Sequence, residues 1–422
     1  MRAEPLAEAL ERAVTDLLGP VTIEGLTRLS GGASRETWAF DAVRTGGVRT
    51  ELILRRDPPG RPSEPGAMSR EAGAIGAAAA AGLAVPEVLL STDERSLWGS
   101  AGLLMRRVGG ETIARRILRD DAYLTARAAL TGQLGAFAAG LHALAPPAGL
   151  PQAADPVGDL RATFAGLGRP SPVFERALSA LEAEPPPNRE PVLVHGDLRL
   201  GNLIVGPQGL RAVIDWELAH SGNPAEDLGW LCVKAWRFGL GPAVAGVGTR
   251  EELLSAYRAG GGADISLDEL RWWELLGTLR WGVICMTQAE VHLSGAHRSV
   301  ELAAIGRRVC EQEWDLLLLL DPDAAAQAVA RRPRPDGAPR GEPAPHGRPT
   351  VSELLDAVRG FLTDRVMTET TGQLAFHARV AANVLAIVAR ELELGAVPPE
   401  SELADNVAAR LAVANPRHFD TD

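Results

Sequence analysis

The residue types and spacing that could carry chemistry lie between residues 193 and 216. Asp197 is followed five residues later by Asn202, and Asp215 comes thirteen residues after that. Phosphoryl transfer from ATP needs a carboxylate that orients the attacking hydroxyl and accepts its proton, together with oxygen ligands that hold Mg²⁺ on the phosphates. Asp197 suits the first task, and Asn202 and Asp215 suit the second. The alternative is that all three are polar residues of ordinary turns between strands.

Short apolar runs flank these residues and would position them. Val192–Val194 and Leu203–Val205 have the composition of buried strands, so residues 195–202 form the loop that joins them. A further strand is expected over Arg211–Ile214, and Asp215 follows its end. Oxygen atoms from the loop and from the neighbouring strand can therefore converge on one metal ion.

The segments upstream of this loop predict a small lobe rich in antiparallel strands. Glycine pairs separate short runs of strand character, and one helical run interrupts them. From Glu111 onward the pattern becomes helical, after a hinge at Gly109 and Gly110. The expected strands are Val21–Ser30, Arg35–Asp41, Val48–Arg55, Pro86–Leu90 and Gly102–Val108, and the expected long helices are Ala67–Ala81, Ala122–Leu144 and Leu267–Leu293.

The chain is therefore expected to be an α+β protein with four parts. The parts are an N-terminal nucleotide-binding lobe (1–110), a helical catalytic lobe (111–320), a linker (321–349) and a three-helix C-terminal domain (350–422). Residues 331–350 hold six prolines and five arginines against two acidic residues, a composition that cannot form a core. A capping box at Thr350 and Glu353 starts the first of the three C-terminal helices.

Composition narrows the class of protein. The formal net charge of −11 argues against general affinity for nucleic acid or for an anionic membrane. No apolar run has the length of a membrane span, and the N-terminus has the pattern of an amphipathic charged helix rather than a signal peptide. The three cysteines lack metal-ligand or redox spacing, which is typical of a reducing compartment. We therefore expect a cytoplasmic protein.

Two stretches resemble a known family. VHGDLRLGNLIV (194–205) and VIDWELAHSGNPAEDLGW (213–230) resemble motifs of the aminoglycoside phosphotransferase and choline kinase superfamily. The nearest branch is that of kinases related to the N-terminal domain of certain acyl-CoA dehydrogenases. The resemblance covers residues from about 20 to 320, and the C-terminal helices resemble a domain of unknown function that follows such kinases. It implies the bilobal protein-kinase-like fold, ATP and Mg²⁺ as cofactors, and a small-molecule hydroxyl as acceptor.

The resemblance implies that the turn before the second strand covers the phosphates of ATP. Ser30, Gly31, Gly32 and Ser34 stand at this place. Glycines let backbone N–H groups approach phosphate, and serine can add a hydroxyl donor. Without that context, the same residues would be an ordinary hairpin turn.

Kinases of this fold carry a lysine on the third strand, whereas this chain has arginine there and only one lysine in total, Lys234. Strand alternation places Arg55 on one face of the strand and Arg56 on the other. We choose Arg55 as the cation of the cleft, and Glu71 on the following helix as its ion-pair partner. Arginine has a planar fork that can hold a phosphate and a carboxylate together, unlike the point charge of lysine. For Glu71, the alternative is a solvated helix charge.

Two further residues are implied as supports of the site. His195 supports the loop that carries Asp197, and we prefer this role to direct proton transfer. Asp227 matches a family position that steadies the same loop, the alternative being a solvated helix face. Asn223 stands where the family usually has aspartate, but it can still cap the helix that follows.

The predicted function is that of an ATP- and Mg²⁺-dependent phosphotransferase that acts on the hydroxyl of a small molecule. The branch suggests a hydroxyacyl-CoA or a hydroxy acid, with an aminoglycoside or choline-like amine as the alternative. A protein kinase is disfavoured because only eight residues separate Asp215 and Asn223, which leaves no room for a long activation segment. A nucleotide-binding pseudokinase or scaffold is the rival from another class. No nucleic acid or membrane partner is expected, while the C-terminal domain is a candidate for self-association or protein contact.

Overall fold

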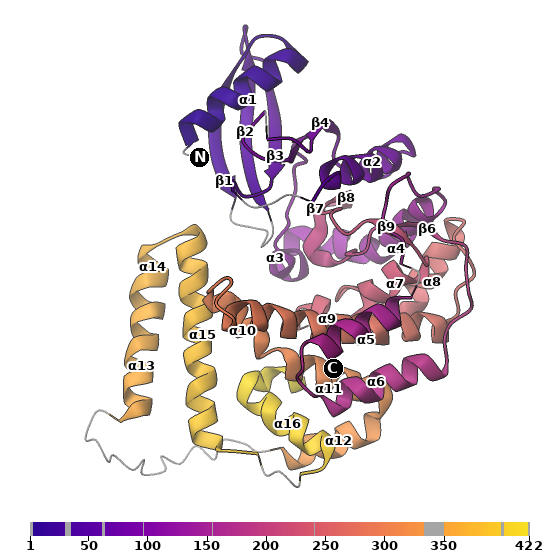
Figure 1. The fold of residues 1–422 in the computed structure, drawn as a ribbon, viewed down its shortest axis with the longest axis vertical. Helices are drawn as coiled ribbons and strands as arrows, with labels where there is room; N and C mark the ends of the chain where they lie inside the picture. The colour runs from indigo at the N-terminus through magenta and orange to yellow at the C-terminus, as the bar shows by residue number, and fades with distance from the viewer. Residues whose placement is uncertain are drawn as a thin grey trace. The chain divides into compact units, whose positions relative to one another are not determined.

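The computed structural model describes residues 3–29, 35–60, 64–95, 97–153, 155–239, 241–332, 350–397 and 401–420. The chain forms two compact units, whose elements are labelled in Figure 1. Every strand among the described residues belongs to the first unit, and the second is helical. The first unit comprises Met1–Ala154, Pro187–Phe238 and Pro242–Trp273; the second comprises Asp155–Pro186, Gly239–Gly241 and Glu274–Asp422.

The N-terminal part of the first unit is an antiparallel sheet of five strands in the order β1-β2-β3-β5-β4. Helix α1 (Ala3–Leu18) lies against the sheet (Figure 1) and buries Leu10 and Val14 among Phe40 and Leu52. Helix α2 (Ala67–Ala80) contacts β4 and β5. The strands are β1 (Val21–Leu29), β2 (Glu36–Arg44), β3 (Arg49–Arg56), β4 (Val88–Thr92) and β5 (Gly102–Arg106). The β-rich lobe expected from the sequence is confirmed.

Alternation along β3 separates its two arginines. Leu52, Leu54 and Arg56 are buried on the face that meets the apolar core, while Arg55 lies on the opposite face. The Arg56 side chain is 1% exposed. Its Nε and Nη2 donate to Glu36 Oε2 at 3.0 and 2.8 Å, and its Nη1 donates to the carbonyl of Trp98 at 2.6 Å. Arg56 is therefore a structural part of the lobe core, not a spare surface charge.

Two small antiparallel ribbons follow in the first unit. Strand β6 (Val192–Val194) pairs with β9 (His220–Gly222), and β7 (Leu203–Gly206) pairs with β8 (Gly209–Val213). The residues between β6 and β7 form the expected loop. The helical elements of this part are α3 (Ala114–Arg119), η1 (Asp121–Tyr123), α4 (Leu124–His142), η2 (Leu200–Asn202), α7 (Ala225–Cys232), η3 (Lys234–Arg237) and α8 (Arg250–Ala259).

The second unit consists of helices. Helix α9 (Leu267–Leu293) begins in the first unit and continues in the second. Helix α11 contacts α6, α12 and α16, and α15 contacts α10, α13 and α16. The remaining bounds are α5 (Pro156–Gly166), α6 (Pro172–Ala183), α10 (Val300–Gly306), α11 (Val309–Leu320), α12 (Pro322–Arg331), α13 (Val351–Phe361), η4 (Leu362–Val366), α14 (Met367–Glu369), α15 (Gly372–Leu394), α16 (Leu403–Ala414) and η5 (Pro416–Asp420).

Two expectations need correction here. The predicted linker 321–349 is wrong at its start, because Asp321 accepts the N–H of Ala324 and so caps helix α12, which packs on α11 and α16. The C-terminal helices were expected to stand as a domain of their own. They belong instead to one compact unit with α10 and α11, since α15 and α16 pack on those helices.

Helix α15 corrects a third expectation. It has 23 residues, and its most apolar stretch of 18 residues has a mean hydropathy of 1.3, so by length and composition alone it could cross a membrane. No run of that kind was predicted from the sequence, because the helix mixes alanine and polar residues with its larger apolar ones.

All three cysteines are free and buried. The predicted phosphate-covering turn, Ser30 to Ser34, lies outside the described residues.

Replacing the buried Arg56 should destabilise the protein far more than replacing an exposed arginine that pairs with the same carboxylate. We expect Arg56→Ala to lower the free energy of unfolding by about 3 kcal/mol, because it removes two hydrogen bonds from Glu36, which keeps Trp38 and Arg28 as partners, and takes the donor from the buried carbonyl of Trp98. Arg28 also pairs with Glu36, at 3.4 Å, but is 55% exposed, so Arg28→Ala should cost less than about 1 kcal/mol. Denaturant unfolding measures both, and equal losses would contradict the structural role of Arg56.

Candidate active site

Asp197 lies in the loop between β6 and β7, and side-chain donors surround its carboxylate. Arg199 Nε donates to Oδ1 at 2.9 Å and to Oδ2 at 3.1 Å. Asn202 Nδ2 donates to Oδ2 at 2.6 Å, and Trp230 Nε1 donates to Oδ1 at 2.8 Å. The side chain is nevertheless 15% exposed. These donors hold an ionised carboxylate in one orientation while part of it still faces solvent.

Asp227, whose side chain has no exposed surface, holds this loop in place through hydrogen bonds to its backbone. Its Oδ2 accepts the backbone N–H of His195 at 2.8 Å, and its Oδ1 accepts that of Gly196 at 2.9 Å. Burial acts to raise the pKa of Asp227, but the hydrogen bond and charge of His142, with help from the N–H of His195, hold it below its usual value. The alternative of a solvated helix charge is wrong.

Two residues that the sequence analysis did not select complete this support. His142, at the end of α4, places Nε2 3.3 Å from Asp227 Oδ2 and Nδ1 3.0 Å from the hydroxyl of Tyr257. Burial raises the pKa of Tyr257 to about 12, so its hydroxyl keeps its proton. No local sequence pattern marks His142 or Tyr257. His142 contacts Asp227, and Tyr257 contacts His142, only after α4, α7 and α8 pack.

Gly196 allows the loop to make its turn. Its φ is +79°, and a Cβ at this position would lie 2.4 Å from the carbonyl oxygen of Leu218. Any other L-residue would therefore be strained in its backbone and would also clash. This glycine brings the N–H groups of residues 195 and 196 to the two oxygens of Asp227.

His195 is buried and both of its ring nitrogens are engaged. Nδ1 accepts the N–H of Asp197 at 3.2 Å, which leaves Nε2 as the protonated nitrogen that donates to the carbonyl of Ile214 at 3.2 Å. The ring also packs edge-on against Trp216 with 4.7 Å between centroids. Neither nitrogen is available to a substrate, so the geometry favours support of the loop over proton transfer.

Arg55 joins two carboxylates that are far apart in the sequence. Its Nη1 donates to Glu71 Oε1 at 2.8 Å, and its Nη2 donates to Asp215 Oδ1 at 2.6 Å. Burial acts to lower the pKa of Arg55, but the charges of Asp215 and Glu71 raise it above its usual value. Glu71 is 2% exposed, so it is not a solvated helix charge. The planar fork of arginine binds two carboxylates at once, whereas the prediction was that it would hold a phosphate and a carboxylate.

A second arginine, Arg35, shares the same carboxylates. It pairs with Glu71 through Nη1, and its Nε lies 3.3 Å from Asp57 Oδ1 and 3.6 Å from Glu217 Oε2. The sequence analysis did not select Arg35, Asp57 or Glu217. Two arginines and four carboxylates (Asp57, Glu71, Asp215 and Glu217) therefore lie together on the sheet face opposite the apolar core.

Asp215 has a left-handed backbone conformation, with φ of +70°, which is uncommon for residues other than glycine and is better tolerated by aspartate than by most. Burial acts to raise its pKa, but the charge and hydrogen bond of Arg55 lower it. Ile214, just before it, donates its N–H to the carbonyl of Asn202 at 2.9 Å. The end of β8 and the loop are thus joined, and the structure brings Asp215 and Asn202 together.

Asn202 and Asp215 fit a magnesium ion by their chemistry. The Asn202 nitrogen is engaged by the carbonyl and carboxylate of Asp197, which leaves the amide oxygen as the atom that can face a cation. Mg²⁺ takes hard oxygen ligands and usually needs only one or two from the protein, with phosphate and water supplying the rest. Across the part of the chain that is described, no group of three or more His, Cys, Asp or Glu side chains is placed to hold a metal ion.

A cation and two indoles border Asp197. The Arg199 guanidinium lies 4.7 Å from the ring centroid of Trp236, and Trp230 and Trp236 have their centroids 5.4 Å apart. Trp230 lay within the quoted family motif, but nothing in its spacing marked it as a donor to Asp197.

The sequence model of the phosphotransferase enzyme family matches residues 25–272, which is more than half of the chain. The chain belongs to this family. Asp197, Asn202, Asp215 and Asp227 all lie within the matched residues. A domain of unknown function (DUF6285) matches residues 368–405, which include helix α15.

Relatives and solved structures agree with this assignment. The chain is 27% identical over 273 residues to acyl-CoA dehydrogenase family member 11 of Rattus norvegicus, covering 58% of this chain and 34% of that protein. It is 41% identical over 64 residues to family member 10 of Mus musculus, covering 15% of this chain and 6% of that protein. The chain thus spans about a third or less of the length of these relatives.

A protein of Ralstonia eutropha JMP134, assigned as an aminoglycoside phosphotransferase, shares the fold with a TM-score of 0.59 and 22% identity. The match covers 75% of this chain and 98% of that chain. The expected kinase-like α+β fold is confirmed.

The support of the loop by Asp227 can be tested through activity and acid stability together. Because the carboxylate pKa is lowered, its contribution to stability is present above the unfolded pKa and is lost as the pH falls through the folded pKa. Asp227→Asn should lower the free energy of unfolding at pH 7 by about 3 kcal/mol and flatten its decline in acid.

The readout that separates positioning from folding is kinetic. In the fraction that remains folded, Asp227→Asn should reduce kcat with little change in KM for the nucleotide, since the loop that carries Asp197 is released while Arg55 is untouched. Asp121→Asn, at an exposed position, is the matched control. An unchanged kcat would contradict the role of Asp227.

Proposed function

We propose that this protein transfers the γ-phosphoryl group of ATP to the hydroxyl of a small molecule. The observation that carries the proposal is the convergence of Asp197, Asn202 and Asp215 with the Arg55–Glu71 pair in one compact unit. An orienting carboxylate, oxygen ligands for a cation and a cation for phosphate are the groups that this chemistry requires.

Asp197 is proposed to orient the acceptor hydroxyl. Its carboxylate accepts the hydroxyl hydrogen as a hydrogen bond, and the hydroxyl oxygen attacks the γ-phosphorus in line with the bond to the β-phosphate. That P–O bond breaks, ADP leaves, and the acceptor proton passes to Asp197. The donors Arg199, Asn202 and Trp230 keep the carboxylate in place, so little reorganisation accompanies the step.

Mg²⁺ is proposed to be held by Asp215 and the amide oxygen of Asn202. When bound, it supplies positive charge to the phosphate oxygens as their negative charge shifts during transfer. Arg55 adds a second positive charge from the protein itself. Its pairing with Glu71 and Asp215 fixes the guanidinium, and the two carboxylates keep it charged.

We further propose that the acceptor is an anionic molecule such as a hydroxy acid or a hydroxyacyl-CoA. Cations near this loop support the choice: Arg199 pairs with Asp197, and η3, which contacts η2, carries Lys234 and Arg237, the latter donating to the carbonyl of Cys232. The similarity to acyl-CoA dehydrogenase family members also points to acyl-CoA chemistry. The acidic residues of the site lie instead around Arg55, where a nucleotide with its cation would be bound.

Replacing the orienting carboxylate tests the proposed reaction. Asp197→Asn should reduce Mg²⁺-dependent phosphoryl transfer roughly 10²-fold or more, because an amide cannot accept the proton and presents hydrogens to the donors of Arg199 and Trp230. Calorimetric binding of ATP with Mg²⁺ should stay within about twofold, since Arg55 and Asp215 are intact. Asp121→Asn should leave both quantities unchanged.

The acceptor panel for this experiment has hydroxy acids and their CoA thioesters in one arm and aminoglycosides and choline-like amines in the other. Transfer only to the cationic compounds would overturn the anionic acceptor while leaving the kinase chemistry in place. ATP binding without transfer to any compound would favour the nucleotide-binding scaffold. Near-normal turnover by Asp197→Asn would overturn the role of this residue.

The arginine on β3 provides the second test. Arg55→Ala should lower kcat/KM for ATP by roughly 10²-fold, because both bound and transferring phosphate lose a cation and the carboxylates of Glu71 and Asp215 lose their shared partner. Arg55→Lys should restore only part, since a single ammonium cannot serve two carboxylates as the fork does. The control is Arg49→Ala on the same strand, because Arg49 is 54% exposed. Equal losses at both positions would mean that Arg55 has no special role.

A further inference from the structure

A cavity of about 740 Å³ lies within the second unit, on the face of α15 that contacts α10. Helix α15 contributes Phe376, Val380, Ile387 and Arg390, and the segment after α16 contributes Arg417. The volume is in the range of cavities that hold small organic molecules. None of these residues belongs to the part of the chain matched by the phosphotransferase family, and α15 lies within the domain of unknown function.

The charged residues of this cavity are unequal in number. Five arginines line it against two glutamates, Glu301 and Glu311. Three of the arginines have carboxylate partners: Arg307 pairs with Glu391, Arg308 with Glu311 at 3.0 Å, and Arg359 with Asp356 at 2.7 Å. The other two, Arg390 and Arg417, have no carboxylate partner among the residues that the structure describes.

Arg390 is a partly buried cation that two backbone carbonyls hold in place. Its Nε donates to the carbonyl of Val413 at 2.6 Å, and its Nη2 donates to that of Ala414 at 3.1 Å. These carbonyls end helix α16, and they orient the guanidinium without neutralising it. Burial and the positive charges of Arg359 and Arg417 lower the pKa of Arg390. The protein thus holds three like charges near one another, an arrangement that a bound anion would relieve.

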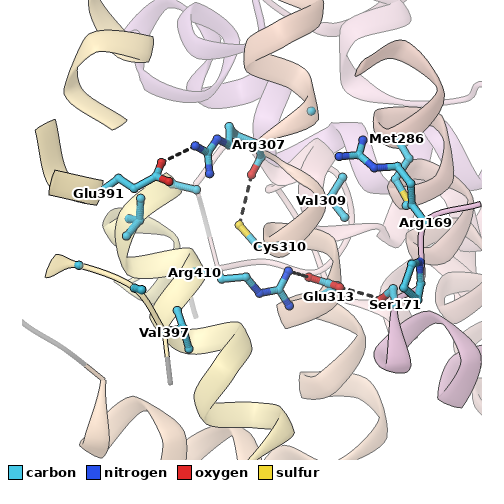
Figure 2. A pocket seen from close by; sticks show the side chains of 16 residues that line it. Arg169, Ser171, Met286, Arg307, Val309, Cys310, Glu313, Glu391, Val397 and Arg410 are labelled. Atoms are coloured by element: carbon cyan, nitrogen blue, oxygen red, sulfur yellow. Dashed lines mark hydrogen bonds and ion pairs between the residues drawn. The ribbon is translucent and has the colours of Figure 1, made fainter. Parts of the chain in front are cut away.

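A second cavity in the same unit provides a comparison. It has a volume of about 430 Å³, and Figure 2 shows its lining side chains. There Arg307 pairs with Glu391, and Arg410 pairs at 2.7 Å with Glu313, which also accepts the Ser171 hydroxyl at 2.7 Å. The protein's own carboxylates neutralise these two arginines. Arg169, which also lines this cavity, has no carboxylate partner among the described residues, so the smaller cavity has one unpaired arginine where the larger one has two.

We infer that the larger cavity is a binding site for an organic anion that carries a phosphate or diphosphate group. Arg390, Arg417 and Arg359 bind the phosphate oxygens, because guanidinium forks match their geometry. Phe376, Val380 and Ile387 contact the apolar part of the molecule. This site is independent of the phosphotransferase site, because all its residues belong to the second unit and none to the first.

The phosphate has two possible sources, a soluble metabolite or the head group of an anionic lipid. The second source deserves an experimental arm because α15 is apolar enough to enter a bilayer and because α13 exposes Val351, Leu354, Val358 and Phe361 along one face. Helices that combine such a face with nearby arginines bind anionic membrane surfaces.

The test uses the full chain with the Arg55→Ala change, which removes the cation proposed to hold phosphates at the other site. Inorganic pyrophosphate is titrated by calorimetry at constant ionic strength, and sedimentation is measured with phosphatidylcholine vesicles that contain or lack phosphatidic acid. The double variant Arg359→Gln, Arg417→Gln removes two exposed cations and spares the helix-capping contacts of Arg390. Arg365→Gln is the matched control, because Arg365 is 69% exposed, pairs with Glu369 and lies outside the cavity.

We expect pyrophosphate to bind the parent and the Arg365→Gln control equally and the double variant at least about tenfold more weakly, since each lost guanidinium removes charge-assisted hydrogen bonds. Binding of phosphatidic acid vesicles that the double variant loses, without pyrophosphate binding, would assign the site to lipid head groups. Equal binding by the double variant and the parent, or no binding of either probe by the parent, would overturn the inference. None of these outcomes depends on phosphoryl transfer.

Discussion

The geometry of the candidate active site depends on the hydrogen bonds that the buried carboxylate of Asp227 accepts. It accepts two successive backbone N–H groups from the loop that carries Asp197 and contacts His142, which in turn contacts Tyr257. Helices α4, α7 and α8 are therefore tied to the loop through one side chain. An ionised carboxylate without exposed surface is costly unless each oxygen is satisfied, and these donors meet that condition. Loss of one donor would leave a buried carboxylate oxygen unsatisfied, and this free-energy cost favours a single conformation of the loop.

Arg55 has a comparable place on the sheet side of the first unit. A lysine could hold one phosphate as a point charge, whereas the guanidinium reaches Glu71 and Asp215 with separate nitrogens. Arg35 shares Glu71, so the carboxylates of this cluster are held by two cations rather than one. The substitution of lysine by arginine is thus accompanied by acidic partners that match its fork. A bound nucleotide would have to share Arg55 with these partners.

The two cavities of the second unit differ in how many of their arginines are paired, and the two sides of the proposed catalytic site differ in the sign of their charged groups. Around Arg55 the protein supplies more carboxylates than arginines, which suits a site that also receives a cation. Around Asp197 the nearby charged groups are mainly cations, which suits an anionic acceptor. In the α15 cavity the arginines exceed the carboxylates, and Arg390 is oriented by carbonyls that carry no full charge. In each case the more numerous charge sign indicates the kind of ligand that we propose for the site.

From the sequence we could predict the loop that carries Asp197, the β-rich lobe and the face of β3 that carries Arg55. These features depend on local rules: the spacing of polar residues between apolar runs, glycine at turns and the two-residue period of a strand. The three C-terminal helices were also predicted, because their apolar residues recur at helical spacing. The start of the linker was not, since Pro322 and the alanines of α12 have no strong local pattern apart from the capping aspartate.

The burial of charged residues and the contacts between distant residues could not be predicted, because they arise when the helices and strands pack. Asp227 and Glu71 could each have been solvated helix residues, because a carboxylate on a helix has the same sequence whether its face is covered or exposed. His142, Tyr257, Trp230 and Arg35 were missed for the same reason: their partners lie between 33 and 115 residues away along the chain. The grouping of Arg359, Arg390 and Arg417 likewise arises from helix packing, which brings together cations that no local period relates.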